Sequence, residues 1–299
     1  MNTPPTSLTH QESAQTRRGI IVMLLSVLGF SVNTLLLKYL GSVREIPSLL
    51  PLVFRAGVGI FIVLVFFRGR RPTRIRPVFT EPLLFWRGLT GLLGTAAYYW
   101  TVPSLGAGKA TLFCNTYVIF AALIAALALG ESLTWKRFIW LALAFAGIVF
   151  LAGPQLQGPA WSIGLDEMIA LFGAVMAAAS VVLVRQLTVH HSIGTIYLAQ
   201  CVWIFVPMIF LTSRHLPALS GMDWTLLIVA ATAASYGQLA MNEGYRCLSV
   251  TTGASLQMLW PVLTAIGGLA WFDERFAPLQ LVGAVLILVS IWAISTRKA

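Results

Sequence analysis

SLGAGKATLFCNTYVIFAALIAALALGESL, residues 104–133, and CLSVTTGASLQMLWPVLTAIGGLAWFDERF, residues 247–276, are two versions of one pattern. Both open with small and hydroxyl residues, continue through a long apolar run and end close to an acidic residue. When the first stretch is shifted by 143 positions, Glu131 falls on Glu274. A period of this kind indicates that the chain is built from two similar halves.

Long apolar runs account for most of the chain. A helix rises about 1.5 Å per residue and the hydrocarbon core of a bilayer is about 30 Å thick, so about 20 apolar residues span it. The runs are longer than membrane β-strands and do not alternate with period two, which excludes a β-barrel. We predict ten transmembrane helices at about 19–40, 47–67, 83–103, 106–130, 136–153, 165–188, 193–212, 223–246, 250–272 and 278–296.

The composition excludes most other classes of protein. Hydrophobic residues make up 58% of the 299 residues and charged residues only 10%, against about 25% charged in soluble proteins. The apolar content is too high for a disordered chain. The three cysteines lie in apolar runs, unlike those of a secreted disulfide scaffold. We therefore predict an all-α membrane protein.

The basic residues predict the orientation of the helices. Ten spans place both termini on one side, and fourteen Lys and Arg residues, Arg87 among them, fall on that side against five on the other. Because positive residues favour the cytoplasmic side, we predict both termini in the cytoplasm. The Arg-rich segment 68–76 also fits a nucleic-acid or anionic-lipid patch. It is short, flanked by spans and free of interleaved aromatic residues, so we interpret it as a topological signal and expect no nucleic-acid partner.

Each half contains five spans, so the two halves enter the membrane from opposite sides. We expect a cytoplasmic tail at 1–18, a first five-helix repeat at 19–153 and a second, inverted repeat at 165–296. Two halves related by an axis in the membrane plane have two near-equivalent arrangements, one open to each side. This construction is typical of secondary transporters.

The ends of the repeated helices carry a family pattern. In both halves small residues open a helix after a tight hairpin, an acidic residue closes it, at 130–134 and 272–275, and a short linker leads to a last helix. The second half also has a proline within the helix, Pro261, and a glycine early in the last helix, Gly283, which the first half lacks. The chain resembles the EamA domain of the drug/metabolite transporter superfamily, over residues 19–296, and is most similar to YddG-type exporters of aromatic amino acids. The resemblance implies a multi-pass transporter of the bacterial inner membrane.

Polar residues inside the spans are costly in lipid and are therefore candidates for a binding site. Asn33 and Ser180 occupy equivalent positions of the two halves, as do Tyr99 and Asn242, which points to a site near the axis between the halves. The alternative for each residue is a hydrogen bond that bridges two helices, worth about 0.6 kcal/mol. The candidate substrate-binding residues are Asn33, Thr95, Tyr99, Asn115, Tyr117, Ser180, Gln238, Asn242, Gln257 and Trp260.

Two ionisable residues of the spans bear on mechanism. Arg55 could bind a substrate carboxylate, or could extend toward the interface and bond backbone carbonyl groups. The runs carry no acidic residue near mid-membrane, so a proton or sodium ion has no obvious carrier, and we expect facilitative transport. Glu243, about one turn from the end of its span, is the residue that could overturn this expectation.

The predicted function is export of small metabolites, with amino acids and above all aromatic ones favoured, by alternating access. Alternatives are a proton-coupled drug/metabolite carrier or a nucleotide-sugar carrier of the same superfamily, although the latter needs several deep cations. An integral membrane enzyme is a further alternative, but the sequence contains none of the common catalytic or metal-binding motifs. We expect no catalytic residue, metal or cofactor. The expected partners are the small-molecule substrate and the lipid bilayer, and the expected state is a monomer.

Overall fold

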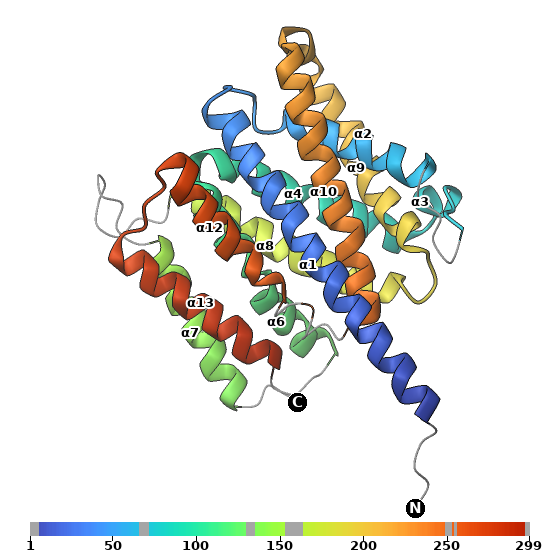
Figure 1. Cartoon of the computed structure of the whole chain (residues 1–299), viewed down its shortest axis with the longest axis vertical. Helices are drawn as coiled ribbons and strands as arrows, with labels where there is room; N and C mark the ends of the chain where they lie inside the picture. The colour runs from blue at the N-terminus through green and yellow to red at the C-terminus, as the bar shows by residue number, and fades with distance from the viewer. Residues whose placement is uncertain are drawn as a thin grey trace, which may run out of the picture.

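The computed structural model describes residues 6–65, 72–129, 135–152, 164–248, 253 and 256–296. Helices form its regular structure, and the described residues include no strand (Figure 1). The predicted all-α class is therefore confirmed. Arg68, Arg70, Arg71 and Glu131 lie outside the described residues. The elements are α1 (Thr6–Ser42), α2 (Leu50–Val65), α3 (Arg76–Thr80), α4 (Pro82–Leu105), α5 (Ala107–Asn115), α6 (Tyr117–Leu129), α7 (Trp135–Ala152), α8 (Leu165–Leu187), α9 (Ile193–Thr212), η1 (Ser213–Ala218), α10 (Gly221–Cys247), α12 (Leu259–Phe272) and α13 (Pro278–Thr296).

Several helices have the length and composition of membrane spans. Four described stretches are long and apolar enough to cross a bilayer: Gln15–Ser42, Leu165–Val184, Ile193–Leu216 and Gly221–Cys247. The helices α2, α7, α12 and α13 contain shorter apolar stretches. Helix α1 begins at Thr6, within the segment predicted as a tail, and continues into the first span without interruption.

The fourth and ninth predicted spans are not continuous helices. Between α5 and α6, Thr116 closes a tight turn: its backbone N–H and its hydroxyl both donate to the carbonyl oxygen of Phe113, at 3.1 and 2.6 Å. In the other half, a turn at Met258 precedes α12, and Pro261 lies in the first turn of that helix, where its missing N–H costs nothing. The two breaks fall at almost equivalent positions of the repeat.

The principal helix contacts run between the halves. Helix α1 packs along α10 and α4 along α8, while α2 and α7 pack against their repeat equivalents α9 and α13. Figure 1 shows α1 beside α10 and α7 beside α13. Because α1 corresponds to α8 and α4 to α10, exchanging the halves leaves this set of contacts unchanged. A two-fold axis relating two similar halves produces this pairing.

Glycine allows these crossings to be close. A Cβ on Gly29 of α1 would lie 2.8 Å from the carbonyl oxygen of Ala233 and 3.2 Å from Gly237 Cα in α10. At the equivalent crossing, a Cβ on Gly94 of α4 would lie 3.2 Å from the carbonyl oxygen of Gly173 in α8. Small residues of this kind let membrane helices approach with their backbones almost in contact.

Candidate functional site

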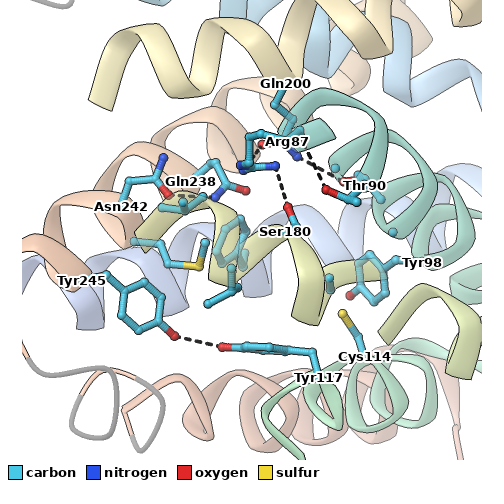
Figure 2. A pocket seen from close by; sticks show the side chains of 18 of the residues that line it. Arg87, Thr90, Tyr98, Cys114, Tyr117, Ser180, Gln200, Gln238, Asn242 and Tyr245 are labelled. Atoms are coloured by element: carbon cyan, nitrogen blue, oxygen red, sulfur yellow. Dashed lines mark hydrogen bonds between the residues drawn. The ribbon is translucent and has the colours of Figure 1, made fainter. Parts of the chain in front are cut away.

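A cavity of about 230 Å³ lies between the two halves, with walls from α1, α2, α4, α5, α6, α8, α9, α10 and α12 (Figure 2). Seven of the ten candidate residues line it, and they come from six different helices. Their packing therefore brings together side chains that are far apart in sequence. The seven are Asn33, Thr95, Tyr117, Ser180, Gln238, Asn242 and Trp260.

Tyr99 lies behind the cavity wall, and its neighbour Tyr98 lines the cavity. The Tyr99 hydroxyl donates to Asn33 Oδ1 at 3.2 Å and accepts from Arg55 Nη1 at 3.3 Å. The Arg55 guanidinium also lies over the Tyr99 ring, 5.6 Å from its centroid. Tyr99 therefore orients two residues that line the cavity.

Asn115 and Gln257 do not line the cavity either. The Asn115 amide donates to the Thr111 carbonyl oxygen one turn earlier, at 3.4 Å. The Gln257 amide donates to Ser26 Oγ at 3.1 Å and to the sulfur of Met23, so it connects the ninth predicted span to α1. Gln257 therefore makes the helix-bridging contact that was the alternative to binding, whereas Asn115 bonds within its own helix.

Arg87 is the main residue that the sequence analysis missed. It was counted with the cytoplasmic residues, but only 2% of its surface is exposed, and it lines the cavity from the second turn of α4. Its guanidinium donates to Ser180 Oγ at 2.7 Å and to Gln200 Oε1 at 2.8 Å (Figure 2). Its position close to the predicted start of a span made it resemble a flanking charge.

Arg55 also lines the cavity, with 6% of its surface exposed. Besides Tyr99 it bonds Gln238, whose Oε1 accepts from Arg55 Nη2 at 3.1 Å. Gln238 Nε2 in turn donates to Asn242 Oδ1 at 3.2 Å. Arg55 thus faces the interior of the protein and does not extend toward an interface.

Aromatic rings form another part of the wall. The ring centroid of Trp260 lies 5.2 Å from that of Phe30 and 5.4 Å from that of Tyr98, the latter edge to face. Across the cavity the hydroxyls of Tyr117 and Tyr245 are 2.9 Å apart (Figure 2). The cavity therefore combines hydrogen-bond donors on one side with an aromatic surface on another.

The ion pairs between the halves are more buried at one end of the molecule than at the other. At the end that holds the last turn of α1, the N–O distances are 2.8–3.9 Å and the carboxylates are largely buried. The pairs there are Lys38–Glu274, Arg44–Asp223 and Lys109–Glu167. The hydrogen bond to Asp223 raises the pKa of the Arg44 guanidinium, which lies in a loop outside the spans.

Glu274 links the two halves at this end. Its carboxylate accepts hydrogen bonds from the backbone N–H groups of Ala107, at 2.6 Å, and Gly108, at 3.2 Å. These groups belong to the first turn of α5, whose N–H groups have no partner within the helix and where a negative charge is favourable. Gly106, with φ of +89°, forms the turn before α5, and a Cβ there would lie 2.8 Å from the Glu274 carboxylate. The second half of the protein thus caps a helix of the first.

At the opposite end, the ion pairs of the described residues are more exposed. Glu243 pairs with Arg18 at 3.1 Å and with Arg246, and His191 pairs with Glu81; Arg18 and Glu81 are mostly or partly exposed. The cavity lining extends toward this end as far as Tyr245 and Leu248, at the end of α10. The cavity is therefore closed at the Glu274 end and extends toward the Glu243 end.

Comparison with known families identifies the protein class. The model of the EamA-like transporter family matches residues 17–153 and again residues 166–296. The chain belongs to the EamA-like transporter family. The double match shows two EamA domains, one in each half, in agreement with the resemblance noted from the sequence. Transport, and not enzymatic catalysis, is the activity that this family name describes.

Several curated relatives of this EamA protein are named as transporters of different compounds. The pseudopaline exporter CntI of Pseudomonas aeruginosa is 24% identical, over 94% of this chain and 97% of its own. A protein named "probable amino-acid metabolite efflux pump" from Escherichia coli is 25% identical, over 95% and 98% of the two chains. The S-adenosylmethionine uptake transporter of Rickettsia felis is 22% identical over 90% of each chain. A solved crystal structure with 19% identity superposes with a TM-score of 0.63 over 93% of this chain and 95% of its own, so the EamA protein shares its fold.

Proposed function

We propose that the protein is a secondary transporter of the bacterial inner membrane that exports small metabolites by alternating access. Amino acids and their derivatives, aromatic ones first, are the proposed substrates. The observation that carries the proposal is the cavity between the two halves, lined by polar side chains on one side and by the Trp260, Phe30 and Tyr98 rings on another. Two of the similar transporters described above are likewise named for export of metabolites.

The asymmetry between the two ends supports an inward-facing state. On the topology that the basic residues favour, Glu243 lies at the cytoplasmic end and Glu274 at the outer end. The cavity extends toward the Glu243 end, and ion pairs between the halves close the Glu274 end. A substrate would enter from the cytoplasm, and release would require the outer ion pairs to separate.

Facilitative transport is the proposed mode. The ionisable side chains that line the cavity in the described part of the chain are arginine, tyrosine and cysteine, without a carboxyl group that could carry a proton. Glu243 is paired with Arg18 and Arg246 near the end of α10 and is not part of the described lining. The proposal therefore predicts transport that follows the substrate gradient alone.

Purified protein in proteoliposomes tests this function. We expect counterflow of phenylalanine, tyrosine or tryptophan that exceeds that of alanine, and no accumulation when only a proton gradient is imposed. Absence of transport for all of these amino acids would contradict the proposed substrates. Accumulation that depends on a proton gradient and disappears in Glu243→Gln would instead contradict the facilitative mode.

Replacing Trp260 with alanine should weaken binding of an aromatic substrate. One lost aromatic pair corresponds to about 0.5–1.5 kcal/mol, or about two- to tenfold in affinity. Trp271 on the same helix is 71% exposed and is the matched control. We expect Trp271→Ala to bind like the original protein in a titration of the reconstituted transporter. Equal affinities for the two variants would show that the aromatic surface around Trp260 does not bind the substrate.

A further inference from the structure

The two cavity arginines lack an anionic partner in the described structure. Arg55 and Arg87 are almost fully buried, and the side chains that accept their hydrogen bonds are the neutral groups of Tyr99, Gln238, Ser180 and Gln200. A buried charge without a counter-charge is costly, and such charges are normally paired or serve a function. Desolvation is the main cost, and repulsion between the two positive charges adds to it.

The described carboxylates lie away from the cavity. No acidic residue is among the described residues that line it. Most buried and half-buried carboxylates of the described residues pair with other basic groups at the two ends of the molecule: Glu167 with Lys109, Asp223 with Arg44, Glu243 with Arg18 and Arg246, Glu274 with Lys38, and Glu81 with His191. Asp166, also half-buried, lies in the first turn of α8 at one of these ends. An anion bound in the cavity would supply the charge that balances the two arginines.

Unused hydrogen-bond donors give a second, independent indication. Arg87 Nε and Asn242 Nδ2 are buried and have no hydrogen-bond partner, and both residues line the cavity. Both atoms are donors, so an acceptor on the ligand would satisfy them and a donor would not. A buried donor is seldom left unpaired in a protein unless a ligand or water completes the site.

The arrangement of the arginines also fits a ligand held between the halves. Arg55 and Arg87 belong to the first half, on α2 and α4, and Gln238, Ser180 and Gln200 belong to the second. An anion bound to both guanidinium groups would take the place of these acceptors, and the freed Ser180 hydroxyl and the amide N–H groups of Gln200 and Gln238 could donate to it from the second half. A guanidinium binds a carboxylate in a charge-assisted, two-pronged geometry that a neutral amide cannot match.

We infer that the substrate is an organic dianion: a molecule with two acidic groups, one for each arginine, and an apolar or aromatic part that lies against Trp260. This inference rests on the proposed transport function and moves the preferred substrates from simple amino acids to derivatives that carry a second acidic group. A simple amino acid supplies one carboxylate, and its ammonium group would face two guanidinium groups. Molecules with a second carboxylate fit the site better.

Four probes of similar size test the charge of the ligand. They are phenylsuccinate with two carboxylates, 3-phenylpropionate with one, phenylalanine as the zwitterion and phenethylamine as the cation. We expect phenylsuccinate to bind the purified protein at least about tenfold more tightly than 3-phenylpropionate in calorimetric titrations, and phenethylamine to bind least. If phenylsuccinate shows no advantage over the other three, or does not bind, the inference is wrong.

Variants test whether the two arginines cause the preference for the dianion. Arg55→Gln and Arg87→Gln should each reduce the preference for phenylsuccinate over 3-phenylpropionate about tenfold, and Arg87→Lys should retain part of it because the charge remains. Arg214→Gln removes an exposed arginine that lies away from the cavity and should change nothing. The preference is a ratio measured on one variant, so partial loss of folded protein does not alter it. Unchanged preference in both glutamine variants would overturn the inference, whereas counterflow of amino acids without any anion preference would leave the proposed transport function intact.

Discussion

Replacing Glu274 with glutamine is expected to open the end of the transporter that the ion pairs close. The carboxylate caps α5 through the N–H groups of Ala107 and Gly108 and lies 3.9 Å from Lys38 Nζ. Glutamine has one acceptor oxygen, and its amide N–H groups would face the positive end of the helix. A hydrogen bond to a charged group contributes about 1.5–3 kcal/mol, so we expect the balance between the two states to shift at least about tenfold.

Cys114 can report this shift, because it lines the cavity. In vesicles of known orientation, a membrane-impermeant thiol reagent should alkylate Cys114 faster from the Glu274 end in Glu274→Gln than in the original sequence. Cys247, which is partly exposed, is first replaced with serine in all samples, and Cys201 is buried.

The neighbouring carboxylate provides the control for this experiment. Asp273 is exposed and ends α12 in the left-handed conformation, with φ of 50°, which asparagine tolerates well. In Asp273→Asn, the reagent should therefore alkylate Cys114 at the same rate as in the original protein. If Glu274→Gln gives the same rate as Asp273→Asn from that end, Glu274 does not hold the closed state.

The sequence predicts the helices of this fold well, because each span must be long and apolar to satisfy its backbone in lipid. It predicts helix breaks less well. Pro261 is a visible signal for the turn before α12, but the break at Thr116 depends on a hydroxyl that bonds its own backbone, and threonine does this only in some settings. The apolar run around Thr116 gives no other indication that the helix ends.

The face of a helix that meets the cavity is harder to predict than the helix itself. Tyr98 and Tyr99 are adjacent on α4, and about 100° of rotation separates them. The polar pattern of the span favoured Tyr99, whereas the structure places Tyr98 on the cavity and Tyr99 behind it. Helix α4 packs mainly against α8 and α9 of the other half, so a pattern within α4 alone could not decide between the two.

Arg87 was missed for a related physical reason. An arginine near the end of a span is normally a flanking charge in the headgroup region. Its burial depends on Ser180 and Gln200, which belong to two other helices and could not be assigned to it from the sequence. The equivalence of Asn33 and Ser180 did indicate where the halves meet, and both residues line the cavity.

Introducing a methyl group at Gly283 is expected to produce the largest loss of stability among single alanine substitutions on α13. A Cβ there would lie 2.5 Å from the backbone nitrogen of Leu151 and 2.7 Å from the carbonyl oxygen of Gly147, both in α7. Backbone atoms cannot rotate away as a side chain can, so the two helices must separate. Overpacking of this kind costs about 1–3 kcal/mol, and we expect the melting temperature in detergent to fall by several degrees.

Gly221→Ala is the matched control, because it adds the same methyl group at the start of α10 where nothing lies within 4 Å. Alanine is the better helix former, so this variant should melt at the same temperature as the original protein or slightly higher.

Gly147→Ala would introduce a second clash at the same crossing, 2.9 Å from the Gly283 carbonyl oxygen. Once one methyl group has separated α7 from α13, the second should cost less, so the double variant should lose less stability than the sum of the single variants. Two results would show that α7 and α13 do not pack as closely as described. One is an equal melting temperature for Gly283→Ala and Gly221→Ala. The other is a double variant whose loss of stability equals the sum of the losses in Gly147→Ala and Gly283→Ala.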